Sequence, residues 1–552
     1  MVLVATVAMA YVPPVAAQEG LKPATTTCER GVALTGLSDP LRRLARLTRL
    51  AGLDTAPDRL YRRPSDRDHL RLCDTPWSGV VGVVDSASAR IAPASLHQVV
   101  NSTYPRDRNN GALWAGRGYG GALDFGLIFR WGPLSAAVLP SVAFQQNEDF
   151  TTLSTDIPGW SELAYPWAFA AIDYPQRFGY DSFVTLDLGQ SYLRLDWEGL
   201  AVGFSTENLW WGPALRNPLL MSNTAPGFPH AFVGTSEPVD IGIGHADVRI
   251  TVGRLTESHY FNTNSFDDHR YFSGITASYA PEFLPGLSVG VSRTYTMQVR
   301  RDTSSWGSFL GKAFSNPREN PVRGIDLNDQ LASIFGRWVF PDAGFEIYGE
   351  WGREDQWGNL LEFLRIPQMS RAYMVGLQKL FEGDGRWTAL YAEHITVADP
   401  VPILTANRGV LMWYTHSQIK QGHTHRGQLL GSWIGPGSNS QVVGFDRYER
   451  WGSVGGYLER VVFNDDAYFA RWADTFSMYG HDLELTVAVR GLLFLGDFDV
   501  SGELSLSRRW GRNFIGYKAF MGAPASEWDF IKELNLGVEL ALRWRPRERR
   551  SQ

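Results

Sequence analysis

The strongest constraint on this chain is an alternation of apolar and polar side chains that persists for about ten residues at a time. In KELNLGVELALRW, residues 532–544, every second residue from Leu534 to Trp544 is apolar, and most residues between them are polar or small. HDLELTVAVR and GDFDVSGELSLSR repeat the pattern. A period of two indicates β-strands with one apolar face and one polar face. Roughly sixteen to eighteen such segments follow residue 111, separated by turn-forming residues.

The length of these segments favours a membrane barrel over a soluble β-sandwich, which is the alternative. A tilted strand needs about 9–11 residues to cross a bilayer. Aromatic residues make up 13% of the chain and gather near the predicted strand ends, as a membrane-interface girdle requires. No segment has the apolar length of a membrane-spanning helix, and no fixed repeat suggests a propeller. The sequence therefore predicts an all-β fold, a transmembrane antiparallel β-barrel.

The N-terminal part of the chain differs from the rest. Residues 1–17 contain an apolar run followed by small residues, which is typical of a signal peptide. Residues 18–110 are predicted to form a periplasmic helical element that plugs the barrel. Within them, Leu41, Leu44 and Leu47 recur at helical spacing between Pro40 and Gly52. A second helix is predicted at residues 64–72.

Cysteine usage and charge add two expectations. Cys28 and Cys73 are the only cysteines, and export would place them in an oxidising compartment, so we predict a disulfide between them. The net charge of −6 offers no basic field to attract nucleic acid. We predict the barrel at residues 111–545 and a basic tail at residues 546–552.

Short turns orient the predicted barrel, because periplasmic turns are short and outer loops are long in bacterial barrels. Tight turns are predicted at Glu198-Gly199, at residues 341–344 and at Gly496-Asp497. The long segments that follow, including residues 353–369 with Trp357 and residues 509–531 with Trp528, should then lie outside. RWGPLS, near Trp131, also resembles a short turn, which requires an extra early strand, near residues 80–84, or a different turn there.

The segment ENLWWGPALRNPLLMSNTAPGFP, residues 207–229, is the candidate binding surface. Flat indole rings can stack on sugars, and amide and guanidinium groups can bind hydroxyls and carboxylates. The alternative is that the indoles belong to the aromatic girdle and the prolines fold the loop inward. The candidate polysaccharide-binding residues, taken from this segment and from two other long loops, are Asn208, Trp210, Trp211, Arg216, Asn223, Trp357 and Trp528.

Other polar clusters give weaker signals. His416 and Ser417 are neighbours on a predicted strand and face opposite sides, which argues against a hydrolase. His423 and His425 share a face, but no nearby cysteine or carboxylate completes a metal site, so we interpret them as structural histidines. The acidic run FDDHR, residues 266–270, could bind a cation but is interpreted as a solvated loop. We therefore predict no metal and no cofactor.

Three stretches resemble the Wzi capsule-assembly family. They are residues 207–230, the run from LWAGRGYGGAL to FRWGPLSAAVLPSVAFQQN, and YTHSQIKQGHTHRGQLLGSWIGPGSNSQ. The resemblance implies an outer-membrane barrel of eighteen strands whose periplasmic side is closed by a helical element. It also implies a lectin-like role, holding capsular polysaccharide on the cell surface, and no enzymatic activity. We expect a monomer in outer-membrane lipid; a channel or porin is the second hypothesis, and an outer-membrane hydrolase is the third.

Overall fold

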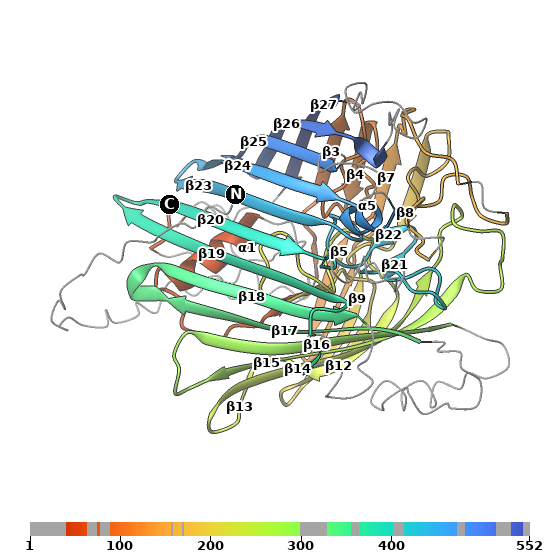
Figure 1. Ribbon diagram of the computed structural model, residues 1–552. Helices are drawn as coiled ribbons and strands as arrows, with labels where there is room; N and C mark the ends of the chain where they lie inside the picture. The colour runs from red at the N-terminus through yellow and green to blue at the C-terminus, as the bar shows by residue number, and fades with distance from the viewer. Residues whose placement is uncertain are drawn as a thin grey trace, which may run out of the picture.

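The computed structural model describes residues 40–62, 74–77, 89–155, 158–167, 171–298, 328–354, 364–365, 367–400, 413–471, 481–514 and 532–544. In this part of the chain, 23 strand pieces form one closed antiparallel barrel (Figure 1). Five pairs of consecutive pieces each make one interrupted strand, so the wall has eighteen strands among the described residues. Both the all-β barrel and the predicted strand number of about eighteen are confirmed.

The interrupted wall strands are β2–β3 (Ala89–Ile91, Ser95–Asn101), β4–β5 (Gly118–Asp124, Leu127–Trp131), β6–β7 (Leu134–Val138, Ser141–Gln145), β8–β9 (Phe183–Asp187, Tyr192–Trp197) and β12–β13 (His230–Thr235, Val239–Asp240). The remaining wall strands are β10 (Leu200–Ser205), β14 (Gly244–Thr256), β15 (His269–Pro281), β16 (Leu287–Gln298), β17 (Asn328–Phe340), β18 (Phe345–Glu354), β19 (Arg371–Gly383), β20 (Arg386–Thr396), β23 (Asn439–Glu449), β24 (Gly452–Phe463), β25 (Asp482–Leu495), β26 (Phe498–Trp510) and β27 (Lys532–Trp544). The last of these, β27, pairs with β3 and closes the barrel.

The wall places its apolar face outward. On β25, Leu485 and Val487 are 44% and 55% exposed, whereas the intervening Thr486 is buried. A soluble sheet would bury the apolar positions, so this arrangement requires an apolar environment around the barrel. The alternation read from the sequence therefore describes the two faces of a membrane wall.

The predicted turns join strands at one end of the barrel. Glu198-Gly199 connects β9 to β10, a 3₁₀ turn at Pro341–Ala343 (η1) connects β17 to β18, and Gly496-Asp497 connects β25 to β26. The RWGPLS turn lies at the same end, between β5 and β6. The extra strand that it requires is β2–β3, residues 89–101. The barrel thus begins before the predicted boundary at residue 111, because Pro93 and the adjacent Val99 and Val100 disrupt the alternation there.

The predicted amphipathic helix is α1, Pro40–Leu50, and it lies inside the barrel (Figure 1). Leu41, Leu44 and Leu47 are buried against inward-facing side chains that include Val339 and Leu380. These wall residues are close to the short turns, so α1 occupies that end of the lumen. The second predicted helix, the Cys28–Cys73 disulfide, the signal peptide and the basic tail lie outside the described residues. No helix among the described residues has the length and apolar character needed to cross a membrane.

Four successive wall strands are interrupted at neighbouring positions. We call this line the crease; it comprises residues 92–94, 125–126, 139–140 and 188–191. The Ala92 amide donates to the Gly126 carbonyl at 2.9 Å, and Leu139 forms a bridge with Gly189, so the breaks lie side by side. A Cβ atom on Gly126 would lie 1.9 Å from the Val138 carbonyl oxygen, which explains the glycine. Proline at residues 93 and 140 removes two amide donors from the ladder.

The lumen is filled by short elements that lie in the N-terminal segment and in the long segments between wall strands. They are β1 (Tyr61–Arg62), β11 (Trp210–Trp211), β21 (Thr424–His425), β22 (Gln428–Leu429), α5 (Asp465–Arg471) and η2 (Arg512–Phe514). Together with inward-facing wall residues such as Phe272, Tyr348 and Met374, these segments form the largest apolar cluster of the described chain. The core of this protein therefore lies within the barrel.

Candidate functional site

The segment at residues 207–229 folds into the lumen. Trp210 and Trp211 are 9% and 1% exposed. Their backbones pair with Arg62 and Tyr61 of β1. The ring of Trp211 lies so close to β15 that a Cβ atom on Gly274 would be 2.4 Å from it.

The expectation that this segment presents an outward-facing surface is therefore wrong for the two indoles. Its apolar side chains pack into the lumen core, and its prolines and glycines allow the chain to turn back. The inward-folded alternative describes the observed arrangement.

Two buried carboxylates of the wall hold the segment in place. Glu393 of β20 accepts hydrogen bonds from the backbone amides of Leu215 and Asn217 at 2.7 and 2.9 Å. Glu350 of β18 accepts one from Leu219 at 3.2 Å. Backbone amides in a buried loop need acceptors, and inward-facing acids of the wall supply them. The sequence analysis did not identify these two glutamates. They could have been found as acidic residues at the inward-facing positions of alternating strands.

Arg216 is part of an ion-pair network inside the barrel. Its Nη2 atom lies 3.1 Å from Glu459 Oε2, and its guanidinium group stacks 4.3 Å from the ring centroid of Tyr457. Arg106 contacts the same Glu459 at 3.2 Å and Glu484 at 2.7 Å. Removing one partner of such a buried pair leaves an uncompensated charge. Arg216 therefore contributes to the scaffold of the lumen.

The side chains of the two predicted asparagines also form their hydrogen bonds with other residues inside the barrel. Asn208 donates to the Ala225 carbonyl at 2.7 Å, and its own amide oxygen accepts from Gln190 at 2.8 Å. Asn223 donates to the Asn109 carbonyl at 2.7 Å. Trp357 and Trp528 lie outside the described residues, so their role stays a prediction.

Two cavities lie beside this segment, on the side of α1. The larger has a volume of about 390 Å³ and is lined in part by Asn208 and Asn223. The smaller has a volume of about 230 Å³ and is lined in part by Trp210, Arg216 and Asn223. The structure thus brings four predicted residues to internal cavities. Guanidinium groups dominate the smaller one, whose basic lining residues are Arg42, Arg43, Arg46, Arg62, Arg108, Arg216 and Arg490.

The predicted histidines serve the packing of residues 413–438. His423 is fully buried, its Nε2 atom lies 2.7 Å from the Leu220 carbonyl oxygen, and burial lowers its pKa to about 4. His425 accepts the Thr256 amide at 3.1 Å through Nδ1. His416 Nδ1 accepts two backbone amides, whereas the adjacent Ser417 points to the surface. These hydrogen bonds are those of structural histidines.

A second group of aromatic residues lies at the end of the barrel opposite the short turns. We call Trp160, Tyr180 and Phe266 the outer aromatic face. Tyr180 and Phe266 are 57% and 80% exposed, and Trp160 forms a β-bridge with Asn262. Polar groups accompany the rings: Tyr180 donates to Glu162 at 2.5 Å, and Lys420 Nζ lies 5.4 Å from the Trp160 ring centroid. Exposed rings beside charged groups can stack on sugars and bind their hydroxyls.

The sequence of the barrel and lumen matches a known family. Residues 89–513 match the family described as capsule assembly protein Wzi. This chain belongs to the Wzi capsule-assembly family. The match covers residues 207–229 and 413–438 and every wall strand except β27, which confirms the resemblance seen in the sequence. No curated protein matches the chain in sequence.

The chain is also similar to several solved structures. The outer-membrane protein Wzi of Escherichia coli, described as a carbohydrate-binding β-barrel involved in group 1 capsule assembly, has a TM-score of 0.54 and 12% identity, over 82% of this chain and 85% of its own. Acinetobacter baumannii OccAB2 has a TM-score of 0.39 and 10% identity, over 83% of this chain and 98% of its own. Pseudomonas aeruginosa OprD has a TM-score of 0.37 and 10% identity, over 85% of this chain and 97% of its own.

Proposed function

We propose that this protein is an outer-membrane carbohydrate-binding barrel that holds capsular polysaccharide on the cell surface. Membership of the Wzi capsule-assembly family supports a role in capsule assembly. The observation that carries the proposal is the packed lumen, because residues 207–229 and 413–438 fill the interior with an apolar core. A filled barrel is better suited to present a binding surface at one end than to conduct solutes.

The arrangement of the ends supports an orientation in the outer membrane. Short turns and α1 share one end, which we assign to the periplasm. The long segments then lie at the cell surface, with the outward Leu and Val side chains in lipid. Export by the predicted signal peptide and a monomeric state belong to the same proposal.

The outer aromatic face is the proposed contact surface for the polymer. Tyr180 and Phe266 are exposed and Trp160 is half-buried at the cell-surface end, whereas the indole of Trp211 is enclosed. Residues 207–229 then act as the scaffold beneath this surface. Trp357 and Trp528, which lie outside the described residues, stay further candidates for contact with the polymer.

The test is a Trp160→Ala, Phe266→Ala double variant, with Trp131→Ala as a matched control. Trp131 is 83% exposed but lies at the short turn between β5 and β6. Each lost stacking contact should weaken binding by about 1 kcal/mol, and a repeating polymer amplifies the loss by avidity. We expect the double variant to shed polysaccharide into the medium while the control retains it.

The measurement is cell-attached against released polysaccharide, normalised to folded barrel at the surface. Heat resistance of the extracted barrel in detergent reports folding. Normalised retention that equals the control would remove the outer aromatic face from the proposal and leave the segments of Trp357 and Trp528 as the contact surface.

A further inference from the structure

Three basic side chains face outward on strands β24–β27, at the end of the barrel opposite the short turns. These strands are consecutive in the wall (Figure 1). Arg460 lies near the end of β24, Arg508 near the end of β26 and Lys532 at the start of β27, and all three side chains are exposed. In each case the residue two positions nearer the short turns is an exposed leucine of the same outward face. These leucines are Leu458, Leu506 and Leu534. The three cations therefore lie directly beyond the apolar band of the wall.

The register of the sheet brings the three cations onto one surface. Arg460 pairs with Leu485 of β25, and Leu485 pairs with Arg508. The two arginines are thus two strands apart in one row, with roughly 10 Å between their Cα atoms. Lys532 pairs with Trp510, and the Arg508 guanidinium group lies 5.2 Å from the Trp510 ring centroid. We call Arg460, Arg508 and Lys532 the basic patch.

Acidic residues of the same strands do not balance the charge of the basic patch. Arg460 donates to two amide oxygens, Asn439 Oδ1 at 3.1 Å and Gln441 Oε1 at 2.7 Å. Within the described residues, no side chain of the basic patch forms an ion pair with a carboxylate. The acids of β23–β27 face the lumen, except for Glu449 near the short turns. Those that face the lumen are Asp446, Glu459, Asp482, Glu484, Asp499, Glu503, Glu533 and Glu539.

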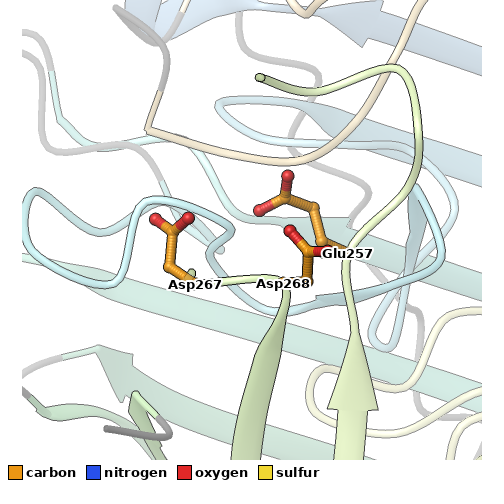
Figure 2. Close-up of side chains that lie close together, drawn as sticks. All are labelled: Glu257, Asp267 and Asp268. Atoms are coloured by element: carbon orange, nitrogen blue, oxygen red, sulfur yellow. The ribbon is translucent and has the colours of Figure 1, made fainter. Parts of the chain in front are cut away.

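Two other parts of the barrel surface differ from the basic patch. Near the short turns, the outward-facing Arg447 is neutralised by Glu449 at 2.7 Å. At the far ends of β14 and β15, one oxygen of each of Glu257, Asp267 and Asp268 lies within 4.8 Å of the others (Figure 2). An anionic ligand on the barrel surface is therefore attracted to the basic patch and repelled beside the carboxylates of β14 and β15.

We propose that the basic patch binds a phosphorylated glycolipid of the outer leaflet, of the lipopolysaccharide class. The acyl chains lie along the exposed leucines, and the phosphates meet the cations at the level of the headgroups. Guanidinium groups bind phosphate through two parallel hydrogen bonds, and the lysine adds a point charge. Two arginines roughly 10 Å apart match a headgroup with two phosphates better than a phospholipid with one.

This inference goes beyond polysaccharide binding. It uses the proposed orientation, in which the end opposite the short turns lies at the cell surface and so meets the outer leaflet. The partner is a lipid, because the basic patch is on the lipid-facing side of the wall and continues directly from its exposed leucines.

The experiment uses the full chain purified in detergent, and native mass spectrometry measures the fraction of the barrel that carries bisphosphoryl lipid A. The double variant Arg460→Gln, Arg508→Gln should bind this lipid at least about tenfold more weakly, because each basic group beside an anionic headgroup contributes about fivefold. Adding Lys532→Gln should weaken binding further. The matched control is Arg447→Gln, which removes an exposed arginine from the opposite end of the same wall and should bind like the unaltered protein.

Phosphatidylglycerol, with one phosphate, is the comparison lipid and should bind at least about fivefold more weakly. Heat resistance in detergent establishes that each variant is folded. Absence of bound lipid A on the unaltered protein, equal binding by the double variant and the Arg447→Gln control, or equal affinity for phosphatidylglycerol would overturn the proposal. The measurement contains no polysaccharide, so such a result leaves the proposed polymer contact unaffected, and failure of the polymer contact on cells leaves lipid binding unchanged.

Discussion

At the scale of single residues, the interior of this barrel depends on polar groups whose partners are distant in sequence. His423 is an example, since a neutral ring can donate from Nε2 to the Leu220 carbonyl, while its face stacks on Tyr414 with centroids 5.8 Å apart. Protonation would add a charge that the surrounding core cannot solvate. The residue therefore links the packing of two lumen segments to pH.

We expect His423 to make the protein less stable in acid. Burial lowers its pKa to about 4, whereas the unfolded chain has a value of about 6.5. Between these values the unfolded state binds more protons, so the stability due to His423 is complete above about pH 6.5 and is lost as the pH falls toward 4. The His423→Gln variant keeps a hydrogen-bond donor for the Leu220 carbonyl and has no group that titrates in this range. The acid-induced loss of roughly 3 kcal/mol in the free energy of unfolding should therefore be absent from this variant. Melting temperatures at about pH 7.5 and about pH 4.5 test this; an equal drop in both proteins would contradict it.

At the scale of elements, the wall was predictable and its contents were not. β25, β26 and β27 keep the alternation over most of their length, and the sequence identifies each of them. The amphipathic α1 was predicted for the same reason. Residues 207–229 have no period, and the direction in which they fold depends on Glu350 and Glu393, which lie far along the chain. Local sequence therefore located the candidate segment but placed its indoles on the wrong side.

Because Trp211 is buried, we expect its removal to destabilise the folded barrel. Trp211→Ala should leave a cavity in the lumen core and lower the free energy of unfolding by about 3–5 kcal/mol. Trp131→Ala, at an exposed position outside the lumen core, leaves no cavity and should lower it by clearly less. Unfolding in detergent with increasing guanidinium measures both. Equal stabilities would show that Trp211 does not contribute to the core.

At the scale of the whole molecule, two layers occupy the lumen. α1 packs near the short turns, and residues 207–229 with 413–438 pack nearer the cell-surface end. The apolar side chains of the two layers pack on different wall residues. Arg46 of α1 joins the layers, because it donates to the Pro213 carbonyl at 2.5 Å and lies 4.5 Å from the ring centroid of Tyr348.

Planar-bilayer recording tests this arrangement. We expect no large steady conductance from the intact protein, and none from a variant that lacks residues 40–50, because the second layer remains in place. Steady conductance in the intact protein would favour the channel hypothesis. Conductance only after the deletion would show that α1 alone closes the lumen.

The crease has a mechanical consequence. Pro93, Phe125, Leu139 and Gly189 of the crease also line the larger cavity. The sheet hydrogen bonds on either side, between β4 and β7 and between β5 and β6, are intact. Because the ladder is already interrupted along the crease, the wall can bend there with little loss of hydrogen bonds between strands. The larger cavity adjoins the crease, so a bend along the crease changes the volume of that cavity.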